Sequence, residues 1–128
     1  MSAKPPFPYQ IHTNRELGLM LAGKKPLAMF VDGAARFPEC VLRYLRMFDR
    51  HVALGRFVRR DHLSDAFGVY ASHRILFALP QEAWRIDEMI ALKESEQWTR
   101  EHERREGELL GYDDWMNDYW LSSYFAPR

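Results

Sequence analysis

The sequence is poor in cysteine: Cys40 is the only one, so no disulfide can form within the chain. Small secreted domains usually rely on several disulfides, and the shortage therefore favours a reducing, cytoplasmic location. Cys40 falls in an apolar-periodic segment, which predicts a buried, unreactive thiol. Long apolar runs are missing too, since none approaches the roughly 20 residues of a membrane-spanning helix. Because the N-terminus lacks the apolar centre of a secretory signal, we expect neither export nor membrane contact.

The short motifs that identify many enzymes are also missing. The chain has no glycine-rich phosphate loop, no paired Cys-x-x-Cys motif, no nucleophile elbow and no EF-hand loop. The absence of these motifs makes an enzyme less expected. It does not decide the question, because active sites also assemble from residues that are distant in sequence. We expect no cofactor and no metal ion, and we favour a protein that is not an enzyme.

The residues that are present are typical of a folded protein. Hydrophobic residues make up 47%, charged residues 28% and aromatic residues 14% of the 128 positions. This length fits one domain. Three prolines among the first ten residues predict an extended arm over residues 1–10, and residues 11–128 are expected to form a single α+β domain.

The spacing of apolar residues predicts helices and strands in the order α-β-α-β-β-α-α-α. A capping-box pattern from Thr13 to Glu16 predicts that the first helix begins there. Three strands are expected to form a small, mainly antiparallel sheet packed by four to five helices, with a helical C-terminal half. Strand order stays open, as does the division of residues 81–110 into one helix or two. The predicted helices cover residues 14–22, 38–53 and 81–93, a segment capped by Ser95 that ends at Gly111, and a segment from Asp113. The predicted strands cover residues 27–31, 56–60 and 70–79.

Charge is distributed unevenly along the chain. Residues 1–80 contain 12 Lys/Arg and 6 Asp/Glu, a net charge of +6, whereas residues 81–128 contain 6 and 12, a net charge of −6. Such a polarity can steer a partner, or the two halves can neutralise each other inside the fold. We favour neutralisation and keep partner binding as the alternative.

A stripe of arginines follows the outer side of the predicted helix 38–53. Arg43, Arg46 and Arg50 recur at helical spacing, and Glu39 stands four residues before Arg43, the spacing of a helical ion pair. The planar guanidinium suits phosphate and carboxylate groups, so the stripe is a candidate surface for an acidic partner or a nucleotide-like ligand. The neutral overall charge makes nucleic acid an unlikely partner. Further arginines nearby in sequence are Arg56, Arg59 and Arg60.

Histidines and carboxylates provide weak candidates for catalysis. Asp61, His62 and Asp65 fall in a segment with loop composition, where they are either ordinary polar surface residues or an acid–base or metal group completed by His51 or His73. We favour the surface loop. The pattern from His102 to Glu106 is similar to half of a zincin motif, but it lacks the second histidine and is interpreted as a salt-bridged helix face. The weak catalytic candidates are His62, Asp65, His73 and Arg59.

Aromatic and acidic residues alternate densely from Tyr112 to Trp120. Helical spacing cannot bury all of these aromatic side chains on one narrow face, so some are expected to line an interface or a pocket. Carboxylates beside aromatic rings are suited to anchor a basic partner. The candidate partner-binding residues are Asp114, Trp115, Asp118 and Tyr119 here, together with Arg43, Arg46 and Arg50 in the arginine stripe.

The leading hypothesis is a non-enzymatic interaction module, such as an inhibitor, an immunity protein or an accessory subunit. It would bind another protein through the acidic-aromatic C-terminal helices or the arginine stripe, and homodimerisation is a second form of the same idea. The alternative is a small ligand-binding protein or small enzyme with a pocket between the sheet and the C-terminal helices. That pocket would draw on Arg59, His62, Asp65, His73 and Trp115.

Overall fold

A computed structural model describes residues 7–64 and 71–125 of the protein. The elements within these residues follow the predicted order and confirm an α+β fold with a helical C-terminal half. The helices are α1 (Glu16–Leu21), α2 (Glu39–Ala53), α3 (Trp84–Lys93), α4 (Arg100–Leu110) and α5 (Asp114–Tyr124), with a 3-10 turn, η1 (Pro80–Glu82), before α3. The strands are β1 (Leu27–Gly33), β2 (Val58–Ser64) and β3 (Ser72–Ala78).

The three strands form one antiparallel sheet in the order β1-β3-β2. The central strand, β3, carries the apolar run Ile75–Ala78, of which every residue is buried. Ile75 lies opposite Phe30 of β1 on one side and opposite Asp61 of β2 on the other. Strand order was not predictable because β3 pairs with both other strands, one of them distant in sequence.

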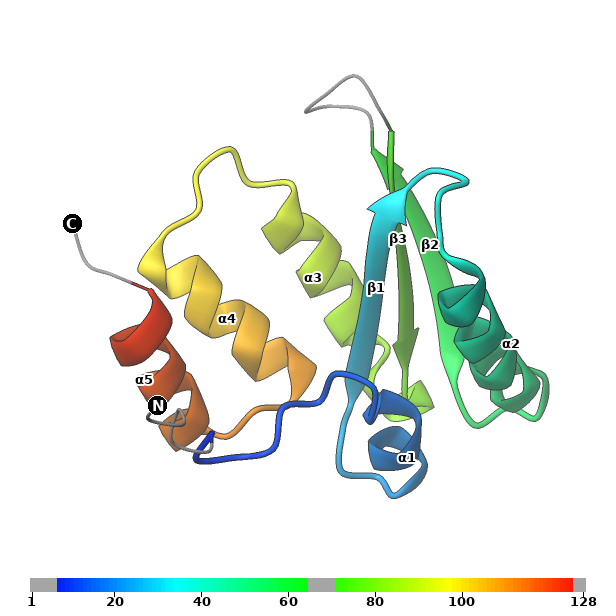
Figure 1. The fold of residues 1–128 in the computed structure, drawn as a ribbon, viewed down its shortest axis with the longest axis horizontal. Coiled ribbons are helices and arrows are strands. Elements are labelled where there is room, and N and C mark those ends of the chain that lie inside the picture. The colour runs from blue at the N-terminus through cyan, green and yellow to red at the C-terminus, as the bar shows by residue number, and fades with distance from the viewer. Residues whose placement is uncertain (1–6, 65–70, 126–128) are drawn as a thin grey trace, which may run out of the picture.

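Helices cover both faces of this sheet (Figure 1). α1 and α2 pack on one face, α3 and α4 pack on the other, and α5 lies against the outer side of α4. Because successive strand residues point to opposite faces, each face has its own buried cluster. Phe77 packs with Phe48 of α2, whereas its neighbour Leu76 packs with Met89 of α3 and Leu109 of α4.

The start of the first helix differs from the prediction. α1 begins at Glu16, and its N-cap residue, Arg15, forms no side-chain capping bond. Asn14 adopts a left-handed backbone with φ of 68°, so the chain turns at the position where the capping box was expected. A capping box does occur at the start of α4, where Thr99 rather than Ser95 is the N-cap and exchanges hydrogen bonds with His102.

Two further local predictions are wrong. Strand β2 continues to Ser64, so Asp61 and His62 belong to a strand rather than a loop, because pairing with β3 outweighs their loop propensity. Cys40 is exposed in the first turn of α2 and is not a buried core thiol. The open question about residues 81–110 is answered by two helices, since α3 ends at Lys93 and α4 begins at Arg100.

Candidate functional site

Helix α5 turns its aromatic residues outward because it is fixed to α4 by two other side chains. Asn117 and Leu121, four residues apart, are buried, with 5% and 1% of their surfaces exposed. The same helical spacing places Trp115 and Tyr119 away from α4, where 50% and 37% of their surfaces remain exposed. The expectation that some of these aromatic residues lie outside the core is confirmed.

The segment before α1 packs along this outer side of α5. Phe7 contacts Tyr119 with ring centroids 5.5 Å apart, and Tyr9 contacts Trp115 at 5.3 Å in an edge-to-face arrangement. Tyr124 stacks on Phe7 at 5.8 Å and thereby extends the contact. We call this connected set of rings the aromatic surface: Phe7, Tyr9, Trp115, Tyr119, Trp120 and Tyr124.

Carboxylates border the aromatic surface. Asp113 and Asp114 are exposed at the N-terminus of α5, and Asp118 forms an ion pair with Arg104 of α4. Asp114 has no ion-pair partner within the part of the chain that the structure describes. The predicted set Asp114, Trp115, Asp118 and Tyr119 therefore lies together on one helix.

Beside the aromatic surface lies a groove of about 380 Å³, bounded by the segment before α1, by α4 and by α5. Tyr9, Tyr112 and Trp120 contribute aromatic walls, and Glu103 and Glu106 contribute carboxylates. Among the described residues that line this α4–α5 groove there is no lysine, arginine or histidine. The groove is therefore both aromatic and negatively charged.

Glu103 occupies an unusual position in this groove. One of its carboxylate oxygens accepts a hydrogen bond from the Trp120 indole at 2.8 Å, and the other accepts one from the Trp98 indole at 2.5 Å. No basic side chain within residues 7–64 and 71–125 forms an ion pair with it. Its charge is thus held in place by neutral donors and is not neutralised.

A buried lysine joins the groove to the start of the sheet. Lys25 is only 2% exposed, and its Nζ lies 2.8 Å from Nδ1 of His12 and donates to the carbonyl of Leu110 at 2.7 Å. Burial lowers the pKa of Lys25 to about 7, although the charge of Glu16 opposes this shift. Burial and the charge of Lys25 lower the pKa of His12 to about 4. His12 also stacks on Tyr112, with ring centroids 3.9 Å apart.

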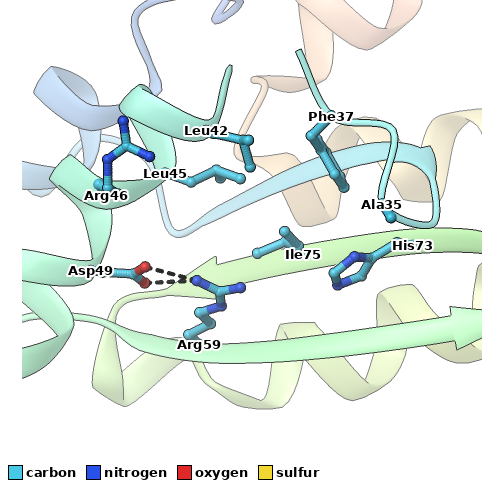
Figure 2. Close-up of a pocket in the computed structure, with 9 residues that line it drawn as sticks. All are labelled: Ala35, Phe37, Leu42, Leu45, Arg46, Asp49, Arg59, His73 and Ile75. Carbon is cyan, nitrogen blue, oxygen red and sulfur yellow. Dashed lines mark hydrogen bonds and ion pairs between the residues drawn. The ribbon is translucent and has the colours of Figure 1, made fainter. Parts of the chain in front are cut away.

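A second region lies between α2 and the sheet, where a pocket of about 400 Å³ opens (Figure 2). Leu42, Leu45, Phe37 and Ile75 form its apolar lining. The polar side chains at the pocket are those of Arg46, Asp49, Arg59 and His73.

Arg59 links the polar groups of this pocket. Its guanidinium donates to both carboxylate oxygens of Asp49 at 2.9 Å and to Asp61 through Nε at 2.7 Å and Nη2 at 2.9 Å. Asp61 in turn lies 2.8 Å from Nε2 of His73. The hydrogen bonds from Arg59, and to a smaller extent the one from His73, lower the pKa of the Asp61 carboxyl. Two of the weak catalytic candidates, Arg59 and His73, therefore meet through Asp61.

The other candidates do not join them. His62 points to the opposite face of the sheet, where its Nε2 lies 3.0 Å from Glu94 at the end of α3. Asp65 lies outside the described residues. Trp115 lies on α5, on the other side of the sheet from α2 (Figure 1). His51, the other suggested ligand, lies 3.1 Å from the guanidinium of Arg56.

The predicted arginine stripe is present on α2, but part of its charge is matched locally. Arg46 and Arg43 reach Glu39 at 3.0 Å and 4.0 Å, the second pair at the predicted helical spacing. Arg50 has no ion-pair partner in the described chain.

Neutralisation between the two halves of the chain is limited. The described ion pairs that join them are Arg60 with Asp87 and His62 with Glu94. The other ion pairs of the described residues join residues of the same half, such as Arg59 with Asp49 and Lys93 with Glu106. The charge polarity is therefore largely retained in the fold.

Sequence reasoning did not identify the α4–α5 groove or the buried lysine. The one local feature of the groove in the sequence is Gly107, an isolated glycine that weakens a helical pattern, and in the structure it faces Asn117. Lys25 gave no such signal, because it stands between another lysine and a proline in what looks like an ordinary charged loop.

Comparison with known proteins supplies no relative for this chain: no family model matches it, no curated protein matches it and no solved structure matches it. Across the described ranges, no helix combines the length and the apolar composition needed to cross a membrane. Nor do the described residues contain a group of three or more His, Cys, Asp or Glu side chains placed to hold a metal ion.

Proposed function

We propose that this protein is a non-enzymatic interaction module that binds a basic surface of another protein through the aromatic surface of α5 and the carboxylates that border it. The observation that carries the proposal is the exposure of Trp115 and Tyr119, at 50% and 37%, within one connected set of rings. Contiguous exposed aromatic residues are uncommon on proteins that act alone, and they are enriched at the centres of interfaces.

The rings of the aromatic surface support one another through contacts within the chain. Tyr9 contacts both Trp115 at 5.3 Å and Tyr119 at 6.0 Å, and Phe7 contacts Tyr119 at 5.5 Å. Side chains that are fixed in advance lose less conformational entropy on binding, so more of the contact energy appears as affinity. Trp and Tyr are also the side chains that most often dominate binding energy.

Charge supports a basic partner. Asp113 and Asp114 lie beside the aromatic surface at the N-terminus of α5, and residues 81–128 carry a net charge of −6. Complementary charge at the edge of an interface accelerates encounter and excludes partners of the wrong sign. The arginine stripe is the weaker candidate surface, because Arg43 and Arg46 already share Glu39.

The proposal is tested by purifying the tagged protein from its own host at low ionic strength and recording native mass spectra. The variants are the double substitution Trp115→Ser with Tyr119→Ser, and Met47→Ser, which removes an exposed apolar side chain from α2. We expect a second polypeptide with the wild type and with Met47→Ser, and none with the double variant. Retention of the polypeptide by the double variant, or its absence from the wild type, would contradict the proposal.

A second candidate function is favoured by His73. Its Nε2 lies 2.8 Å from Asp61, its Nδ1 has no hydrogen-bond partner in the described chain, and the residue lines the pocket of about 400 Å³ beside the apolar side chains of Phe37 and Ile75. Such a site suits a small apolar ligand that carries a hydroxyl group. Titration with phenol, followed by the imidazole resonances, would then shift those of His73 and leave those of His62 unchanged. Equal shifts, or none, would remove this candidate.

A further inference from the structure

We propose that the α4–α5 groove receives an arginine side chain of the partner protein. This inference rests on the proposed function, because the groove opens beside the aromatic surface and shares Tyr9 and Trp120 with it. Its volume of about 380 Å³ falls within the range of ordinary small-ligand pockets.

The charge of the groove selects a cation. Glu106 is paired with Lys93 of α3, but Glu103 has no basic partner among the described residues. An unpaired carboxylate at a partly enclosed site is stabilised by a positively charged ligand far more than an exposed one would be. The aromatic walls add to this preference, because the faces of Trp and Tyr attract cations.

The hydrogen-bond acceptors favour a guanidinium over an ammonium group. Each oxygen of Glu103 accepts one indole N–H and retains capacity for a second bond, so the carboxylate can still receive two parallel donors. The two indoles also fix its orientation. A guanidinium presents two parallel N–H groups in a rigid plane and stacks on aromatic rings, whereas a lysine presents a compact point charge.

The lining of the groove contains a further acceptor, the side-chain amide of Asn117. Asn117 is 5% exposed, and its Nδ2 donates to the carbonyl of Tyr112 at 3.3 Å, while its Oδ1 has no partner within the described residues. The amide rests against Gly107, where a Cβ atom would lie 2.0 Å from Oδ1. This oxygen belongs to the lining of the groove, where it offers an arginine N–H one more acceptor.

The test uses Nα-acetyl-arginine amide as the probe, with the full chain labelled for NMR. The indole N–H groups of Trp98 and Trp120 are bonded to Glu103 and report the groove directly, while that of Trp84 on α3 is the internal reference. We expect the first two resonances to shift and the reference resonance to stay. We expect binding at least tenfold weaker for the corresponding lysine amide, and no shift with the neutral citrulline amide.

A matched pair of variants separates the site from general electrostatics. Glu103→Gln keeps the size of the side chain and removes its charge, and Glu101→Gln removes the same charge from an exposed position two residues away. We expect Glu103→Gln to weaken arginine binding at least tenfold and Glu101→Gln to change it less than twofold. Should Glu103→Gln fail to fold, the comparison of arginine with citrulline on the wild-type protein still decides.

The outcomes distinguish this inference from the function on which it rests. Similar shifts with the arginine, lysine and citrulline amides, or no shift at all, would overturn the groove assignment. If the partner were then still lost with the double variant of Trp115 and Tyr119, the interaction module would stand without the arginine pocket. If arginine binds specifically but no partner polypeptide is found, the arginine pocket is supported and the proposed interaction module is contradicted.

Discussion

Lys25 and His12 face each other in the protein interior, with Nζ of the lysine 2.8 Å from Nδ1 of the histidine. Burial lowers the pKa of both side chains, and the charge of Lys25 lowers the pKa of His12 further. The pair joins the segment before α1 to the end of α4 through the carbonyl of Leu110. The pair therefore connects the segment that also forms the aromatic surface to α4.

This pair predicts an unusual dependence of stability on pH. The pKa of Lys25 is about 7 in the folded protein and near its ordinary value of 10.5 in the unfolded chain. Between these values the unfolded chain binds a proton that the folded protein does not, so the free energy of unfolding rises with pH there, by at most about 1.4 kcal/mol per pH unit. Urea unfolding of the wild type and of Lys25→Met at about pH 7, 8 and 9 measures this rise.

The comparison isolates the lysine from other titrating groups. In Lys25→Met the rise between about pH 7 and 9 should be largely lost, because no other group close to Lys25 titrates across that window. Below the ordinary histidine pKa of 6.5, both proteins should lose stability as His12 becomes protonated on unfolding. Parallel curves for the two proteins between pH 7 and 9 would show that Lys25 is not a buried, largely neutral amine.

Gly107 predicts that the contact between α4 and α5 tolerates no additional atom. A Cβ at this position would lie 2.0 Å from Oδ1 of Asn117 and 2.9 Å from its Cγ, so either the buried Asn117 side chain or the two helices must shift. We expect Gly107→Ala to lower the free energy of unfolding by about 2 kcal/mol. Gly18 is the matched control, because it lies in α1 with nothing within 4 Å, and Gly18→Ala should raise stability by about 0.5 kcal/mol. Equal effects of the two substitutions would contradict the described packing.

Substitution of Arg59 is expected to lower the free energy of unfolding moderately, by an amount that depends on pH. Its substitution by glutamine leaves Asp49 and Asp61 without their cation, and we expect a loss of about 1 kcal/mol near neutral pH, because both carboxylates keep partial contact with water. Arg43→Gln breaks a fully solvated pair and should cost less than about 0.5 kcal/mol. Chemical denaturation of both variants measures the difference.

The sign of the pH effect provides a second check on Arg59. The pKa of Asp61 is lowered in the folded protein, chiefly by Arg59, so the associated stability is present above the ordinary aspartate pKa of 3.8 and is lost as pH falls through the lowered value. The difference between wild type and Arg59→Gln should therefore shrink in acid. A difference that stays constant from neutral pH to about pH 2 would indicate a role in packing rather than in charge pairing.

The parts of the fold that depend on local pattern could be predicted from the sequence. The apolar run that ends β3 and the helical spacing of Leu45 and Phe48 in α2 identify their elements without tertiary information. The parts that depend on distant partners could not. Asp61 and His62 have loop propensity, and only the pairing of β2 with β3 holds them in a strand.

The candidate site, too, is predictable where it depends on local pattern and not where it depends on distant contacts. The density of aromatic residues in α5 predicts that some of them are exposed, but the choice of Trp115 and Tyr119 depends on the burial of Asn117 and Leu121 against α4. The α4–α5 groove combines Tyr9 with helix residues that lie 94 to 111 positions later in the chain, from Glu103 to Trp120, and no local pattern connects them.

The aromatic surface is tested most directly by the affinity of the captured partner for the single variant Trp115→Ser, measured by calorimetry beside the wild type and Met47→Ser. Trp115 lies on the exposed side of α5, so its loss leaves the buried contacts of Asn117 and Leu121 in place. If the aromatic surface is the binding site, Trp115→Ser weakens binding by about 2 kcal/mol or more, roughly thirtyfold, as expected for a central tryptophan. Met47→Ser should leave affinity within about twofold. Wild-type affinity for Trp115→Ser would contradict the proposal that this protein binds its partner through α5.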